Sequence, residues 1–275
     1  MYDYDGEFRF VSKYKLNVCA LPKSMSTVLT GVMCLLYDPE EFLKEGRTIN
    51  TDNWDIRFCK KKNEASSIEQ IKNRNDTGYK TDSEKWKHVL IVREPMERFI
   101  SGFLDRCVLH EFWREKAFLC FGCKTNLTCL LENLDKTMSD PKLRIHSVDT
   151  YHFFPQNWWC QMGINIFDKF TILKVSRENT NEFWQKFYSI LRNQSVPNEL
   201  VELVDKQVHS GETSHTTFHQ KDLRKKIFEE LQEPYHMNLF IKAFYYDYVL
   251  FGFPLPNVRY SLAGSKTCQN TSLSK

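Results

Sequence analysis

The chain has little glycine in the region where a nucleotide-binding loop would need it. It has ten glycines in 275 residues, and none lies between Gly6 and Gly31. The phosphate-binding loop of P-loop NTPases places glycines ahead of its lysine, because a residue without a Cβ lets the backbone wrap closely around phosphates. Lys23 lies in the glycine-free stretch. The sequence therefore disfavours a nucleotide kinase or another P-loop NTPase.

Long apolar runs are also absent from the start of the chain. Residues 1–15 are polar and aromatic, with no stretch of signal-peptide or membrane-anchor length. We predict that they form a polar N-terminal segment outside the main domain. Either the sequence begins downstream of an anchor or the protein is not lumenal, and the residues leave both interpretations open. We expect contact with a membrane only through an anchor that this sequence does not include.

The sequence lacks an excess of one charge sign. Its 38 Lys and Arg face 35 Asp and Glu, which gives a net charge of +3 at pH 7. A protein held to nucleic acid by bulk charge needs a larger basic excess, so we expect no nucleic-acid partner. An anionic ligand must instead meet a local basic cluster, such as Lys60–Lys62 or Arg224–Lys226. The simpler interpretation of each cluster is a solvated face.

Cysteine, in contrast, is abundant, with nine residues. This density predicts disulfides and hence a lumenal location. Cys120 and Cys123 have the spacing of half a zinc site, but no second such pair and no His pair follows at zinc-finger spacing, so we expect no metal. Four Asn-x-Ser/Thr sequons fit the same compartment. The sequons are at Asn75, Asn126, Asn193 and Asn270.

Two stretches seventy residues apart resemble the halves of one anion-binding site. The first is Pro22-Lys23-Ser24-Met25-Ser26-Thr27, which follows an apolar run at 16–21 and opens an amphipathic run at 28–37. This order predicts strand, loop and helix. It places Lys23 and three hydroxyl groups at a helix N-terminus, where free backbone N–H groups and the helix dipole favour an anion.

The second stretch is Val92-Arg93-Glu94-Pro95, which follows an apolar run at 89–92. Pro95 suits the first turn of a helix, so Arg93 would lie at a strand end, with Arg98 and Ser101 in the helix that follows. Each basic residue alone has a simpler interpretation, as a solvated side chain or half of a surface ion pair, and Arg98 has a possible partner in Glu94 one turn back. The paired motifs make them candidates for a site.

The remaining chain predicts the fold class. A third buried strand is expected over 170–175, and helices are expected over 181–192, 197–207, 222–232 and 234–251. Strands separated by helices predict an α/β fold with a mainly parallel central sheet flanked by helices.

One stretch between the two motifs stands apart by composition. Residues 44–86 are polar, and we predict a surface excursion anchored by Trp54 and Trp86. We expect one domain over residues 16–253 and a disordered polar tail over 254–275.

At the two motifs the chain resembles the Golgi carbohydrate sulfotransferases of sulfotransferase family 2, especially the chondroitin and dermatan 4-O-sulfotransferases and their divergent nematode members. Pro22 to Thr27 is similar to the family's 5′-phosphosulfate loop, Pro-Lys-x-x-x-Thr. Val92 to Ser101 is similar to its 3′-phosphate loop, Val-Arg-Asp-Pro-x-x-Arg-x-x-Ser, with Glu94 in place of Asp. His152-Phe153-Phe154-Pro155-Gln156 resembles the family's His-Trp-x-Pro-Gln stretch, and 246–253 resembles its final helix.

The resemblance implies a P-loop-NTPase-like sulfotransferase fold and the co-substrate 3′-phosphoadenosine 5′-phosphosulfate (PAPS), without a metal. Lys23 would neutralise charge on the oxygen that bridges phosphorus and sulfur, and Arg93 would grip the 3′-phosphate through its planar fork. The residues expected to bind the donor are Lys23, Ser24, Ser26, Thr27, Arg93, Arg98 and Ser101.

The resemblance also bears on the acceptor, and the residues suggest a general base that would take the proton of the acceptor hydroxyl. The resemblance implies a glycan acceptor, the 4-hydroxyl of N-acetylgalactosamine in a chondroitin-type proteoglycan chain, and a Golgi location. His152 is the first candidate for the general base and His110 the second, because histidine suits proton transfer near neutral pH. The aromatic surroundings of His152 fit a buried structural histidine equally well. The alternative function is a catalytically silent relative that binds a glycan or a partner enzyme.

Overall fold

A computed structural model describes residues 5–52, 55–140, 148–163, 168–211 and 219–256. Its centre is a five-stranded sheet in the order β3-β1-β2-β4-β5. Strands β2, β4 and β5 are parallel, whereas β1 is antiparallel to both β2 and β3. The strands are β1 (Phe8–Val11), β2 (Leu16–Cys19), β3 (Glu64–Ala65), β4 (Lys87–Arg93) and β5 (Phe170–Val175).

The sheet is buried on both faces, which explains why its parallel strands are continuous apolar runs. Along β4, Val89 and Ile91 pack into one core while Leu90 and Val92 pack into the other. This alternation follows from the two-residue period of a strand. The predicted α/β fold is therefore confirmed, with its three expected strands in parallel.

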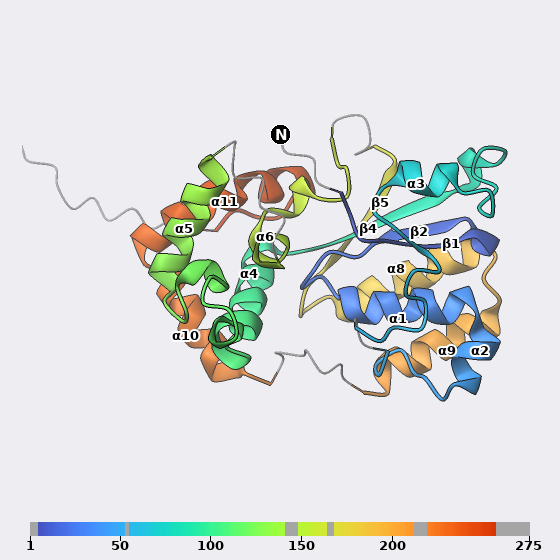
Figure 1. Cartoon of the computed structure of the whole chain (residues 1–275), viewed down its shortest axis with the longest axis horizontal. Helices are drawn as coiled ribbons and strands as arrows, with labels where there is room; N and C mark the ends of the chain where they lie inside the picture. Colours follow the sequence, from blue (N-terminus) through green and yellow to red (C-terminus); the bar gives the residue numbers. More distant parts are fainter. Residues whose placement is uncertain (1–4, 53–54, 141–147, 164–167, 212–218, 257–275) are drawn as a thin grey trace, which may run out of the picture.

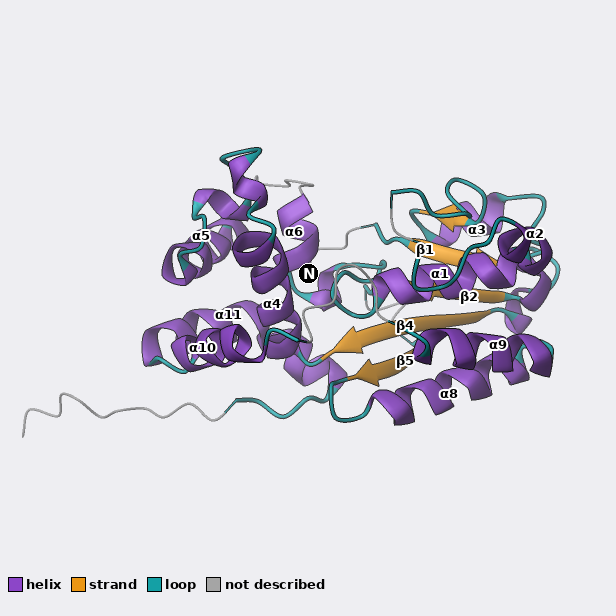
Figure 2. Ribbon diagram, turned by 90° about the horizontal axis from the view of Figure 1, so that it is seen from below, coloured by secondary structure: helices purple, strands orange, loops and turns teal. Residues whose placement is uncertain are grey.

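The helices form a layer on one face of the sheet and a helical region beside its carboxyl edge (Figures 1 and 2). The layer pairs α1 (Ser26–Tyr37) with α2 (Pro39–Lys44), α8 (Thr180–Asn193) and α9 (Asn198–His209). The helical region contains α4 (Pro95–Phe103), α5 (Leu127–Ser139), α6 (Val148–Phe153), α10 (Lys221–Leu231) and α11 (Pro234–Phe251). On the opposite face, α3 (Ile68–Asn73) packs over β1.

One region differs from the expected domain layout. Residues 8–11, expected in the N-terminal segment, form β1, whose Phe8 and Phe10 are fully buried. The sheet therefore begins before residue 16. The predicted tail lies outside the described residues from 257 onward.

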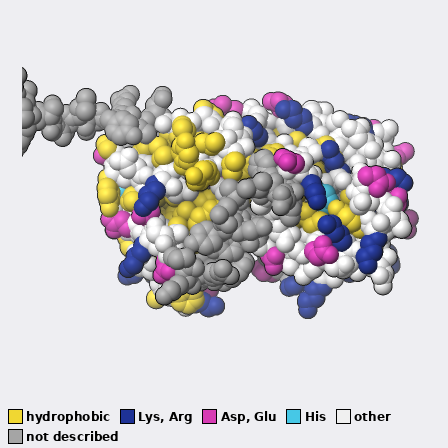
Figure 3. All heavy atoms as spheres, turned by 90° about the horizontal axis from the view of Figure 1, so that it is seen from above, with side chains coloured by type: hydrophobic (Ala, Val, Ile, Leu, Met, Phe, Trp, Pro, Cys, Tyr) yellow, Lys and Arg dark blue, Asp and Glu magenta, His cyan; other side chains and the backbone are white. Residues whose placement is uncertain are grey.

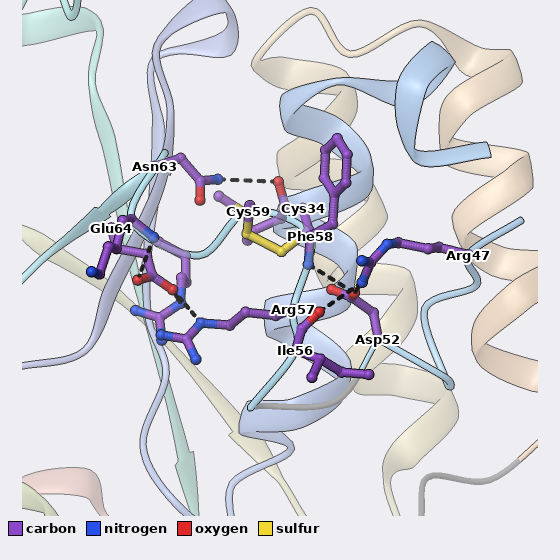
Figure 4. The surroundings of a disulfide bond; sticks show 12 residues. Cys34, Arg47, Asp52, Ile56, Arg57, Phe58, Cys59, Asn63 and Glu64 are labelled. Atoms are coloured by element: carbon purple, nitrogen blue, oxygen red, sulfur yellow. Dashed lines mark hydrogen bonds and ion pairs between the residues drawn. A yellow bond between two sulfur atoms is a disulfide. The ribbon is translucent and has the colours of Figure 1, made fainter. Parts of the chain in front are cut away.

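Residues 44–86 are more than a surface excursion, because they carry β3 and α3 and are tied to α1 (Figure 4). A disulfide joins Cys59 to Cys34, and the Asn63 side chain donates to the carbonyl oxygen of Met33, 3.3 Å away. Asp52 is buried and accepts from the backbone N–H of Phe58. Trp86 is a buried anchor as predicted, whereas Trp54 lies outside the described residues.

The predicted disulfides are confirmed. Four bridges form among the described residues, and Cys120 and Cys123 bond to different partners instead of sharing a metal. The longest closure, Cys19–Cys160, spans 141 residues and fixes the end of β2 to the segment after α6. The pairs are Cys19–Cys160, Cys34–Cys59, Cys107–Cys120 and Cys123–Cys129.

The surface mixes charges of both signs. On the face in Figure 3, Lys and Arg side chains are interspersed with Asp and Glu, and apolar side chains gather toward the helical region. Within the described ranges, no helix is both long and apolar enough to cross a bilayer.

Candidate functional site

The loop between β2 and α1 carries Lys23 without the help of glycine. Lys23 and Met25 both adopt left-handed backbone conformations, each with φ of 64°. Such angles are costly for residues with a Cβ, so the surrounding contacts must hold them. Met25 is the N-cap residue of α1, and its side chain makes no capping hydrogen bond. The first turn of α1 therefore keeps its anion-favouring N-terminus uncapped by a side chain.

The second motif turns from β4 into α4 and contacts the first. Glu94 caps α4 by accepting from the backbone N–H of Glu97 at 2.6 Å, and Pro95 is the first helical residue, as predicted. Arg93 Nη1 donates to the carbonyl oxygen of Lys23, 3.1 Å away, and its other nitrogens donate to the Glu97 carboxylate. The two predicted loops therefore lie side by side.

A cavity of about 890 Å³ opens where these loops meet. Ser24 and Arg98 are fully buried and lie outside its wall. The predicted site residues that line the cavity are Lys23, Ser26, Thr27, Arg93, Ser101 and His152.

Lys23 has an acidic partner that the sequence analysis missed. Its Nζ lies 2.5 Å from Asp105 Oδ2, and both side chains are largely buried. Burial lowers the pKa of Lys23, and the Asp105 carboxylate opposes that effect. Asp105 lies in the π-helical segment Leu104–Leu109, which continues α4. A π-helical turn changes the direction of side chains relative to an α-helix. The 3.6-residue period of α4 therefore does not predict that Asp105 faces Lys23.

Arg98 and Ser24 contact the protein itself. Arg98 donates to the carbonyl oxygens of Pro22, Tyr151 and Phe154 at 2.9 to 3.3 Å. It therefore fixes the start of the Lys23 loop against α6. The Ser24 hydroxyl donates to Gln156 Oε1, 3.2 Å away. Arg98 does not take up the alternative partner Glu94, whose carboxylate accepts from the hydroxyl of Tyr248 and from the α4 N-terminus.

Gln156 joins all three motifs, a role that the sequence analysis did not assign. Its Oε1 accepts from Ser24 and from the backbone N–H of Arg93, and its Nε2 donates to the Arg93 carbonyl oxygen at 2.8 Å. Its own backbone N–H donates to the buried carboxylate of Asp247 on α11. One amide side chain therefore sets the distance between the Lys23 loop and the end of β4.

The two candidate bases differ in position. His152 is partly exposed in the cavity, and its Nδ1 lies 2.7 Å from the Val148 carbonyl oxygen, which leaves Nε2 available as an acceptor. Burial, with the nearby charges of Lys23 and Arg106, lowers its pKa well below the usual value, so the ring is neutral. His110 is exposed, lies outside the cavity wall and has Nδ1 within 3.3 Å of Asp105.

The groups that line the cavity suit an anionic ligand. Across the described ranges, His, Cys, Asp and Glu form no group of three or more with a geometry able to hold a metal ion. The cavity instead combines cationic side chains, hydroxyl groups and a helix N-terminus, which are the groups that bind anionic oxygens.

Comparison with known proteins agrees with this geometry. The sequence model described as "Sulfotransferase family" matches residues 6–254. "Carbohydrate sulfotransferase chst-1" of Caenorhabditis elegans is 30% identical over 91% of this chain and 76% of its own length. "Putative sulfotransferase vep-2" of the same organism is 34% identical, over 78% of this chain and 66% of its own length. No solved structure matches the chain.

Proposed function

Because the chain belongs to the sulfotransferase family, we propose that it transfers the sulfonate of PAPS to a glycan hydroxyl. The observation that carries the proposal is the meeting of Lys23, the α1 N-terminus and Arg93 around one cavity. Such transfer depends mainly on positioning and on stabilising charge, as phosphoryl transfer does. A metal ion is not part of the scheme, since Lys23 supplies the charge.

The donor is held at its two charged ends. Ser26, Thr27 and the backbone N–H groups of the α1 first turn bind the 5′-phosphate, and Arg93 and Ser101 bind the 3′-phosphate. Arg98 and Ser24 act differently from the sequence expectation, because they position the loop through the protein contacts described above. They are therefore positioning residues in this proposal.

Transfer proceeds in line at sulfur. The acceptor hydroxyl gives its proton to His152 Nε2 while its oxygen forms a bond to sulfur. The bond between sulfur and the 5′-phosphate oxygen breaks, and Lys23 stabilises the charge that develops on that oxygen. The ion pair with Asp105 orients the Lys23 ammonium beside this position.

The acceptor we propose is the 4-hydroxyl of N-acetylgalactosamine in a chondroitin-type chain, acted on in the Golgi. A glycan acceptor is supported by the relative named as a carbohydrate sulfotransferase. The 4-O position and the chondroitin chain follow the family resemblance of the motifs. The lumenal location is supported by the four disulfides and by the exposed sequon residues Asn75, Asn126 and Asn193.

Calorimetry with adenosine 3′,5′-bisphosphate, combined with sulfonate transfer from labelled PAPS to desulfated chondroitin, tests the proposal. Lys23→Ala should reduce the transfer rate by about 100-fold or more, and Arg93→Ala should weaken nucleotide binding by about tenfold or more. Lys186→Ala and Arg192→Ala, at exposed positions on α8, are the matched controls. Nucleotide binding without transfer to any glycan would favour the silent relative. Failure of the folded wild type to bind the nucleotide would refute the donor site.

A further inference from the structure

The basic run Arg224–Lys226 divides into two environments. Lys225 and Lys226 are exposed, as the interpretation of a solvated face requires. Arg224 is only 7% exposed and lines the cavity from α10, which packs beside α4 (Figure 1). One of the three basic residues therefore belongs to the site.

Arg224 shares its end of the cavity with two further arginines. Arg93 reaches it from the end of β4, and Arg177 reaches it from the second position after β5. Burial, followed by repulsion from Arg93 and Arg177, lowers the pKa of Arg224 to about 10, so it stays charged near pH 7. The Glu97 carboxylate favours the charged form of Arg224 and accepts two hydrogen bonds from Arg93.

Three guanidinium groups that line one cavity make this part of it strongly cationic. A phosphate monoester suits this arrangement, because it carries nearly two negative charges and three oxygens that accept from planar forks. Lys23 and the α1 N-terminus belong to the first motif and are proposed to contact the 5′ end of the donor. The three arginines are therefore left for its 3′ end. The 3′-phosphate is the group that distinguishes the donor from an ordinary adenosine 5′-phosphate derivative, and it suits the part of the cavity that the three arginines line.

We propose that Arg177 and Arg224 join Arg93 in a three-arginine site for the 3′-phosphate and make the enzyme select a 3′-phosphorylated nucleotide. The inference rests on the proposed function and adds two specificity-determining residues that neither sequence motif contains. Arg224 lies more than 120 residues after Arg93 in the chain, and α10 brings it to the site.

Nucleotide binding by the full chain tests this assignment. Dissociation constants of adenosine 3′,5′-bisphosphate and adenosine 5′-monophosphate are compared for wild type, Arg177→Gln and Arg224→Gln. We expect each variant to bind the bisphosphate about tenfold or more weakly and the monophosphate within about twofold of wild type. Lys225→Gln, which removes a neighbouring exposed charge from the same helix, should leave both constants unchanged.

The possible outcomes separate this inference from the proposed function. If each variant loses the same affinity for both nucleotides, the arginines act through general electrostatic attraction and the 3′-phosphate site is refuted. The site is also refuted if both variants bind the bisphosphate as tightly as wild type, or if they lose affinity only for the glycan. A wild type that binds neither nucleotide would refute the proposed function as well. If Arg224→Gln does not fold, Arg177→Gln and the charge-conserving Arg224→Lys decide the matter, and Arg224→Lys should retain preference for the bisphosphate.

Discussion

At the scale of the residue, the two candidate bases differ in whether they line the cavity. Both histidines have Nδ1 against a backbone carbonyl oxygen, but His152 lines the cavity whereas His110 does not. We expect His152→Ala to lower kcat by about 100-fold or more, the range of general base catalysis, with nucleotide affinity unchanged. His110→Ala should keep most of the activity. The reverse pattern in a steady-state transfer assay would move the base to His110.

His88 in β4 predicts acid sensitivity of the fold. It is buried, with Nδ1 2.9 Å from Asn17 Nδ2 and Nε2 2.9 Å from the Tyr79 hydroxyl, and burial lowers its pKa to about 4. The unfolded chain binds a proton at this residue below about pH 6.5, whereas the native state does so only below about pH 4. The free energy of unfolding should therefore fall as the pH falls across this window, by about 3 kcal/mol in total.

Urea unfolding at pH 7.5 and pH 4.5 measures this effect. His88→Gln should be less stable than wild type at pH 7.5 but should lose less stability on acidification. His209→Gln, at an exposed position on α9, is the control and should lose as much as wild type. An equal pH dependence of the His88 variant and wild type would contradict the assignment.

Individual residues were predictable where a local pattern marks them. Lys23 and Arg93 stand where an apolar run ends and a helix starts, and the structure places both on the cavity. No comparable local sequence pattern identifies Asp105 or Arg224 as a site residue. Asp105 depends on a π-helical turn, and Arg224 looks identical in sequence to its exposed neighbours until α10 is packed against α4.

At the scale of the element, the site depends on the contacts that Gln156 makes between two loops and α11. Gln156→Leu would leave the Ser24 hydroxyl and the Arg93 backbone groups without this buried partner. Each unpaired group costs about 1 to 3 kcal/mol, and the loops would lose their register. We expect lower stability together with at least about tenfold weaker binding of adenosine 3′,5′-bisphosphate.

Gln194→Leu is the control for this prediction. Gln194 also bridges separate segments, donating to the carbonyl oxygens of Tyr14, Lys15 and Lys85, but at the other end of the sheet. It should lower the melting temperature and leave nucleotide affinity unchanged. Equal affinity losses in the two variants would show that loss of stability, and not loop register, weakens binding.

The predicted elements fail where a strand is too short to show an apolar pattern. Helices and parallel strands have periodic or continuous apolar patterns, so β5 and α11 were predicted with their observed bounds. The short strands β1 and β3 were missed. β1 has four residues and β3 has two, which leaves little sequence in which a pattern could be seen.

At the scale of the whole molecule, the disulfides differ in the number of residues between the two cysteines that they join. Cys19–Cys160 spans 141 residues and joins the sheet to the helical region, whereas Cys123–Cys129 spans six within the helical region. In the chain-entropy account, the longer closure removes more freedom from the unfolded chain, a difference of about 3 kcal/mol between the two bonds.

The double variant Cys19→Ala/Cys160→Ala should therefore lose more stability than Cys123→Ala/Cys129→Ala in urea unfolding under oxidising conditions. It should also weaken binding of adenosine 3′,5′-bisphosphate, because Cys19 ends the strand that leads into the Lys23 loop and Cys160 lies four residues after Gln156. Equal stability in the two double variants would refute the entropic argument. Unchanged nucleotide affinity in a folded Cys19→Ala/Cys160→Ala protein would show that Gln156 and Arg98 hold the site without the bridge.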